Sequence, residues 1–205
     1  MTPDEFRQLL VEQTDLQMLG PCLHDDITPF VFEPKPDTWN AFRDELAVQL
    51  GVARGDVRVV GSGRLGFSMK PQGNLVGFKD KSDIDVVIVN ADIFDHLWFS
   101  LLDAAYPRRP FTDANRLGGW LRDRSSEVYT GWITPLEIRL DSKIYGPKAK
   151  PVLEFNVRWF NTLKQVSRHP PRRHEDVEGR LYRTWRHAEL YHLHSLAVLR
   201  KSLLE

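Results

Sequence analysis

The sequence predicts an α/β (α+β) protein with a small mixed sheet, flanking helices and a helical C-terminal region. Two short runs of β-branched residues, at 57–60 and 84–89, have the composition of buried strands. Apolar residues recur at helical spacing after the second run, from Ile93 to Leu102. A strand that leads directly into such a helix is typical of α/β architecture. We expect the helices to pack on one face of the sheet.

The N-terminal part is predicted to be helical. Apolar residues over 3–18 repeat at helical spacing and indicate an amphipathic helix that ends before Gly20-Pro21. A connector rich in proline and aspartate follows. A second helix is expected over 38–50, with Asp37 as its N-cap and Gly51 as its stop.

The two strands enclose a glycine-rich turn and a long loop. Gly-Ser-Gly follows the first strand directly, and residues 62–67 are expected to open a short helix. The segment 69–82 contains glycine, proline and lysine and is typical of a hairpin or mobile loop. After the second strand, Asn90 is expected to cap a helix that ends before Pro107.

The C-terminal half gives weaker patterns. We expect a helix over 115–127, a strand over 131–140, a helix over 151–166 and a long terminal helix over 179–204. The predicted organisation is a core with N-terminal helices over 1–145, and a helical region over 146–205 that packs on it.

Composition restricts the class of protein. The chain has 205 residues, of which 41% are hydrophobic, and its 28 basic residues balance its 28 acidic residues. No net charge would draw it to nucleic acid as a whole, so a polyanion site must be a local patch. No segment has the pattern of a signal peptide or the length of a membrane span, and we expect a cytoplasmic protein without membrane contact. The single cysteine, Cys22, is expected to serve packing.

The order of a few polar residues carries the functional prediction. On a strand, residues two apart share a face, so Asp83 and Asp85 would present their carboxylates side by side. A hard divalent cation relieves the repulsion between them, and Mg²⁺ (or Mn²⁺) accepts one or two carboxylates together with phosphate oxygens. Gly61 would let the backbone approach a phosphate, Ser62 would supply a hydroxyl and an amide, and Lys70 would add positive charge.

These residues resemble the signature of the polymerase-β-like nucleotidyltransferase superfamily. GSGRLGFSMKP followed by SDIDVVIV is most similar to the minimal nucleotidyltransferases and the oligoadenylate-synthase-like group. The resemblance implies that Gly61 and Ser62 bind the triphosphate of a nucleotide and that Asp83 and Asp85 bind two Mg²⁺ ions. It implies transfer of a nucleoside monophosphate from a nucleoside triphosphate to a hydroxyl. The acceptor, whether a protein, an RNA, another nucleotide or a small molecule, stays open, as does a partner protein.

The resembled family has a third carboxylate on a neighbouring strand. Glu137 and Asp141 are candidates because both fall in or near the strand expected over 131–140, and Glu137 is taken as catalytic. Each is equally well explained as an ordinary surface acid, in which case the chain would be a nucleotide-binding module with impaired catalysis. A further alternative is a HEPN-like ribonuclease, since Arg186 and His192 loosely resemble the arginine-histidine motif of that group.

Overall fold

The computed structural model describes residues 1–79, 82–106, 126–135, 147, 150–170 and 176–204. The described strands are β1 (Val57–Val60), β2 (Ile84–Val89), β3 (Trp132–Ile133) and β4 (Val177–Tyr182). They form one sheet in the order β1-β2-β4-β3. β2 runs antiparallel to β1 and parallel to β4, and β3 runs antiparallel to β4. The sheet is therefore mixed, and the predicted strands over 57–60 and 84–89 are confirmed.

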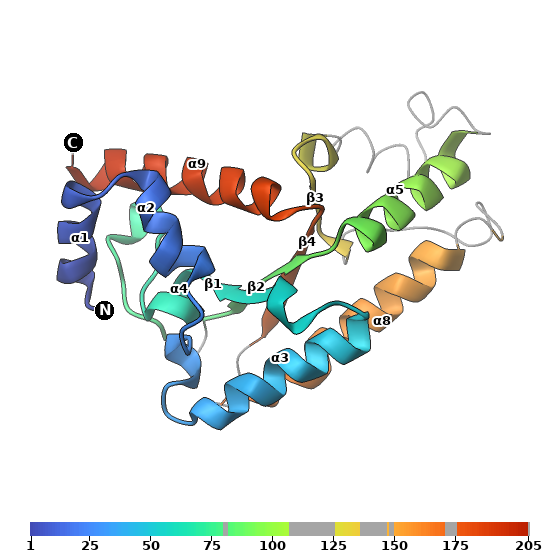
Figure 1. The fold of residues 1–205 in the computed structure, drawn as a ribbon, viewed down its shortest axis with the longest axis horizontal. Coiled ribbons are helices and arrows are strands. Elements are labelled where there is room, and N and C mark those ends of the chain that lie inside the picture. Colours follow the sequence, from blue (N-terminus) through green and yellow to red (C-terminus); the bar gives the residue numbers. More distant parts are fainter. Residues whose placement is uncertain (80–81, 107–125, 136–146, 148–149, 171–175, 205) are drawn as a thin grey trace.

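Helices cover both faces of the sheet (Figure 1). Against one face lie α3 (Pro36–Leu50), α5 (Ala91–Ala105) and α8 (Lys150–Val166). Against the other lie α1 (Pro3–Glu12), α2 (Asp15–Leu19), the short α4 (Gly61–Leu65) and the long α9 (Trp185–Leu204). The expectation of helices on one face was wrong. The physical reason is β2, whose apolar residues alternate between the two cores, so that neither face can be left to water.

The predicted helix over 3–18 is two helices in the structure. Thr14 caps α2: its hydroxyl accepts from the Gln17 amide, and the Gln17 side chain accepts from the Thr14 amide. This capping box starts a new helix immediately after α1 ends at Gln13. The described part of the chain also contains the short helical turns η1 (Gly20–His24), η2 (Phe30–Phe32), η3 (Arg54–Asp56) and η4 (Pro71–Gly73).

The predicted caps of the two longer helices have mixed outcomes. The Asn90 side chain accepts from the Ile93 amide at 2.8 Å and begins α5, as expected. Gly51 ends α3 in the left-handed conformation at φ +71°, also as expected. Asp37, however, lies in the first turn of α3 and is not its cap, because Pro36 already occupies the first helical position.

The C-terminal region is not wholly helical. The long helix expected over 179–204 begins at Trp185, and residues 177–182 form β4 inside the sheet. The helix expected over 151–166 is confirmed as α8. Of the strand expected over 131–140, the described part contains only β3, and the helix expected over 115–127 lies almost entirely outside the described residues. Among the described helices, none is both long and apolar enough to cross a bilayer.

Candidate active site

The turn between β1 and α4 is shaped by Gly61. Val60 is still extended, and Gly61 then takes φ +62° to begin the helix, a conformation that L side chains rarely adopt. A Cβ at this position would also lie 3.2 Å from Oδ2 of Asp85. The turn therefore lies next to the carboxylate, and a side chain at position 61 would press on it.

Ser62 is the next residue and belongs to the first turn of α4, which confirms the predicted short helix. Its side chain is half-buried. Within the described part of the chain its hydroxyl forms no hydrogen bond, while its carbonyl accepts from the Gly66 amide at 2.9 Å. The hydroxyl is thus available to a ligand beside the Asp85 carboxylate.

Asp83 and Asp85 lie on either side of Ile84, at the beginning of β2. Ile84 is fully buried in the core beneath α3 and α8, so its neighbours on either side face the opposite way. Asp83 is exposed just before the strand, and Asp85 is half-buried within it.

Glu178 lies next to Asp85 on the adjacent strand. The two residues are direct partners in the parallel pairing of β2 with β4, and their side chains share one face of the sheet. Glu178 is exposed, and Arg180 follows it two positions later on the same face. Sequence patterns gave no indication that either residue lies beside Asp85.

The charges around Asp85 act on its protonation. Burial raises the pKa of its carboxyl, the positive charge of Arg180 opposes that rise, and the negative charges of Glu178 and Asp83 add to it. Lys70, on the exposed loop after α4, lowers the pKa. Two anions beside a half-buried third are the arrangement that a divalent cation stabilises.

Arg180 is held in place by two aromatic residues, Tyr191 and Trp132. Its guanidinium donates to the hydroxyl of Tyr191 on α9 and lies 4.9 Å from the centre of that ring. It also lies 5.2 Å from the ring centre of Trp132 on β3. An arginine fixed in this way presents a constant positive charge near Asp85.

The residues suit magnesium in their chemistry. Mg²⁺ prefers oxygen ligands and takes one or two carboxylates, the remainder coming from water and phosphates. Asp83, Asp85 and Glu178 supply such oxygens, and among described residues none of the three carboxylates is hydrogen-bonded or ion-paired to a side chain. In the described residues no three acidic, histidine or cysteine side chains converge closely enough to hold a metal by themselves. A bound cation would therefore need phosphate oxygens of the ligand in addition to these carboxylates.

The remaining predicted residues are not part of this cluster. Glu137, taken as catalytic from the sequence, and Asp141 lie outside the described residues. Lys70 is described, and its charge reaches Asp85, but its side chain is exposed on the loop.

The two residues of the ribonuclease hypothesis differ in burial. His192 is 6% exposed, and its Nε2 has no hydrogen-bond partner in the described structure. Arg186 is exposed and pairs with Glu189 at 3.4 Å. A buried imidazole cannot contact RNA without a rearrangement of α9, so this arrangement does not favour cleavage chemistry.

The chain matches no protein-family model, no curated protein and no solved structure. The geometry around Gly61 and Asp85 therefore carries the functional argument.

Proposed function

We propose that the protein is a magnesium-dependent nucleotidyltransferase, which moves a nucleoside monophosphate from a nucleoside triphosphate to a hydroxyl. One observation carries the proposal: the Gly61 turn lies against the Asp85 carboxylate, with Glu178 paired to Asp85 on the next strand. This is the juxtaposition of a phosphate-binding turn and a carboxylate cluster that the resemblance to the polymerase-β-like superfamily implies.

Each residue has a defined task in this proposal. The backbone at Gly61 and the Ser62 hydroxyl contact the triphosphate, since the turn leaves room for close approach. Asp83, Asp85 and Glu178 would supply oxygen ligands to magnesium, or to manganese in its place, and oxygens of the triphosphate would complete its coordination. The positive charges of Arg180 and Lys70 offset negative charge around Asp85.

The reaction exchanges one phosphorus–oxygen bond for another. The acceptor hydroxyl loses its proton to solvent and its oxygen forms a bond to the α-phosphorus, while the bond from the α-phosphorus to the bridging oxygen breaks and pyrophosphate leaves with that oxygen. Bound magnesium would lower the pKa of the acceptor hydroxyl and stabilise charge on the leaving pyrophosphate. The carboxylates of β2 and β4 keep these groups in line, because they come from two hydrogen-bonded strands rather than from a loop.

The acceptor is not assigned by these residues. A protein side chain, an RNA end, a nucleotide and a small molecule all present the required hydroxyl. A partner protein that supplies or positions the acceptor is compatible with the same site.

Pyrophosphate release tests the proposal. The full chain is incubated with ATP, GTP, CTP or UTP and with Mg²⁺ or Mn²⁺, and released pyrophosphate is measured. We expect release with at least one nucleotide and a loss of about 100-fold or more in Asp83→Asn and in Glu178→Gln, because each removes a metal-ligand charge and keeps the side-chain shape.

Asp103→Asn is the matched control. Asp103 is an exposed carboxylate near the end of α5, away from β2 and β4, and its substitution should leave the rate unchanged. Unchanged release in Asp83→Asn would refute the assignment of the site. Tight nucleotide binding without release, over a range of acceptors, would instead indicate a binding module that lacks catalysis.

A further inference from the structure

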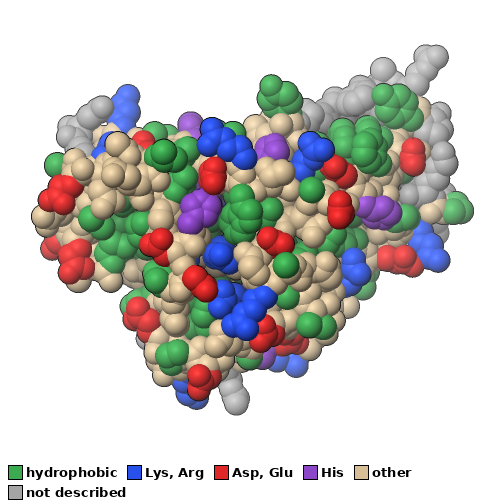
Figure 2. Space-filling view, viewed as in Figure 1, with side chains coloured by type: hydrophobic (Ala, Val, Ile, Leu, Met, Phe, Trp, Pro, Cys, Tyr) green, Lys and Arg blue, Asp and Glu red, His purple; other side chains and the backbone are tan. Residues whose placement is uncertain are grey.

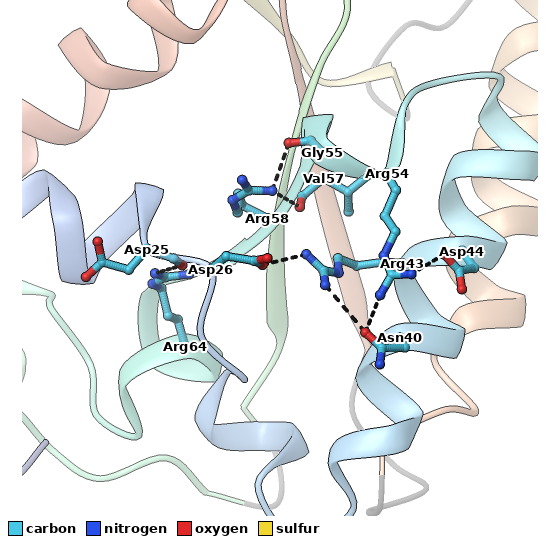
Figure 3. Close-up of polar contacts among 10 residues, drawn as sticks. All are labelled: Asp25, Asp26, Asn40, Arg43, Asp44, Arg54, Gly55, Val57, Arg58 and Arg64. Atoms are coloured by element: carbon cyan, nitrogen blue, oxygen red, sulfur yellow. Dashed lines mark hydrogen bonds and ion pairs between the residues drawn. The ribbon is translucent and has the colours of Figure 1, made fainter.

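A second polar cluster lies where α3, η3 and β1 meet the connector that follows η1 (Figure 3). Three arginines, Arg43 on α3, Arg54 on η3 and Arg58 on β1, surround the connector residue Asp26. The hydrogen bond from Arg43 lowers the pKa of the Asp26 carboxyl, and the charges of all three arginines lower it further. One carboxylate thus lies in the field of three cations.

Arg43 is a buried cation with a free donor. Its Nη1 donates to Asp26 Oδ1 at 2.7 Å, and its guanidinium lies 4.5 Å from the ring centre of Trp39. The residue is 7% exposed, yet its Nε has no partner among the residues that the structure describes. A buried N–H without an acceptor is destabilising, because the group has lost its hydrogen bond to water.

Arg58 also has a buried N–H donor without a partner in the described structure. Its Nη1 donates to the carbonyls of Gly55 and Val57 at 2.8 Å and 3.0 Å, and its Nε is buried without a partner in the described structure. Asp56 acts on it only through its field, and no described carboxylate forms an ion pair with it. Arg54 is better satisfied, since it pairs with Asp44 at 3.2 Å and donates to Asn40.

Asp26 is the most exposed part of the cluster. Its side chain is 69% exposed, against 9% for that of Arg43. It lies in a segment without helix or strand, and the main chain before it is held by Arg64, which donates to the carbonyls of Pro21 and Asp25. The side chain can therefore rotate into solvent while the backbone stays in place.

We propose that Arg43, Arg58 and Arg54 form an anion site for a phosphate group, which Asp26 occupies as an internal substitute. A phosphate carries more negative charge and more acceptor oxygens than a carboxylate, so it gains more from the field of the three arginines while it accepts from Arg43 Nη1 as Asp26 does. The site opens to solvent: basic side chains gather near the middle of the face seen in Figure 2, and the Arg54 side chain is 44% exposed.

Binding of inorganic phosphate tests this proposal without any nucleotide turnover, so the result does not depend on the proposed function. Phosphate is titrated at low salt by calorimetry into the wild type and Asp26→Asn. The substitution removes the competing charge, and we expect phosphate to bind about tenfold more tightly, as for a gain of about 1.4 kcal/mol. Arg58→Gln in the Asp26→Asn background should abolish the gain.

Asp15→Asn is the matched control. Asp15 forms the same kind of ion pair, with Arg200 at 2.7 Å, and its substitution should not tighten phosphate binding. The position of binding is read from the indole N–H signal of Trp185, whose ring centre lies 5.4 Å from the Arg58 guanidinium. A phosphate-dependent shift of that signal supports the site.

Two further ligands identify the source of the phosphate. AMP represents a free nucleotide, and a short RNA with a 5′-phosphate represents a strand end; adenosine and the same RNA with a 5′-hydroxyl are their counterparts without the terminal phosphate. Tighter binding of either phosphorylated member supports the site and names its source. Equal phosphate affinity in the wild type and Asp26→Asn, or tightening that survives Arg58→Gln, overturns the proposal.

Discussion

Gly61 combines two constraints that can be separated by comparison with Gly51. Both residues have positive φ, +62° and +71°, so an alanine at either should cost about 1–2 kcal/mol of backbone strain. Only at Gly61 would the new methyl group meet a side chain, Oδ2 of Asp85 at 3.2 Å, whereas nothing lies within 4 Å of a Cβ at Gly51. We expect similar losses of stability in Gly61→Ala and Gly51→Ala, measured by urea unfolding.

The activities of the two variants should differ. Gly61→Ala places its methyl group between the turn and the carboxylate, and we expect it to lose nucleotide binding and pyrophosphate release. Gly51→Ala should retain both per folded molecule. Equal activity in the two variants would show that the contact of Gly61 with Asp85 has no functional role.

His192 should make stability depend on pH. Burial lowers the pKa of its imidazole to about 4 from the ordinary 6.5, and the charges of Arg180, His24 and Arg64 act in the same direction. The unfolded chain therefore takes up this proton at higher pH than the folded chain does. The contribution of the neutral imidazole to the free energy of unfolding is fully present above pH 6.5. It falls as the pH approaches 4, by about 3 kcal/mol in total.

Urea unfolding between pH 7.5 and pH 4.5 measures this effect. We expect His192→Phe, which removes the titrating group and the unpaired Nε2, to lose less stability on acidification than the wild type. His194 is exposed on the same helix, and His194→Gln should keep the wild-type dependence. Parallel stability curves for the wild type and His192→Phe would contradict the prediction.

The strands show which parts of the fold and site local patterns can predict. β1 and β2 are β-branched throughout their buried positions, and the turn and carboxylates lie directly beside them in sequence, so Gly61, Ser62, Asp83 and Asp85 were recognisable. β4 reads VEGRLY, in which the buried position 179 is a glycine. The apolar alternation that identifies a strand is therefore interrupted. Its polar face carries Glu178 and Arg180, whose position beside Asp85 no sequence pattern predicted.

The glycine in β4 has a packing cause. A Cβ at Gly179 would lie 2.8 Å from Cζ2 of Trp159, whose indole on α8 is fully buried. The ring occupies the space that a strand side chain would fill. The register that brings Glu178 to Asp85 thus depends on a tertiary contact, which no local pattern contains.

Gly179→Ala should be destabilising for this reason. The methyl group must displace a rigid ring in a packed core, and we expect a loss of about 1–3 kcal/mol in the free energy of unfolding. Gly55→Ala is the control, because a Cβ there meets nothing within 4 Å and the change should stay within about 0.5 kcal/mol. Equal urea midpoints for the two variants would show that Trp159 adapts without cost.

The whole sheet joins distant parts of the chain. β1 and β2 come from the first half, whereas β4, between β2 and β3, comes from the last 30 residues. The core beneath α3 and α5 also contains Phe155, Trp159 and Leu163 of α8 and Leu181 of β4. Residues 146–205 therefore supply an inner strand and part of the main core.

A chain of residues 1–145 should accordingly fail to fold alone. It would leave the β2 edge unpaired and expose apolar surface that buried residues of α8 now cover, at about 1.5–3 kcal/mol for each large side chain, against a usual total stability of about 5–15 kcal/mol. Circular dichroism should show no cooperative thermal transition for 1–145, whereas the full chain should unfold cooperatively. A cooperative transition in the fragment would mean that β4 and α8 are additions to a self-sufficient core, and Glu178 would then belong to a separable part of the site.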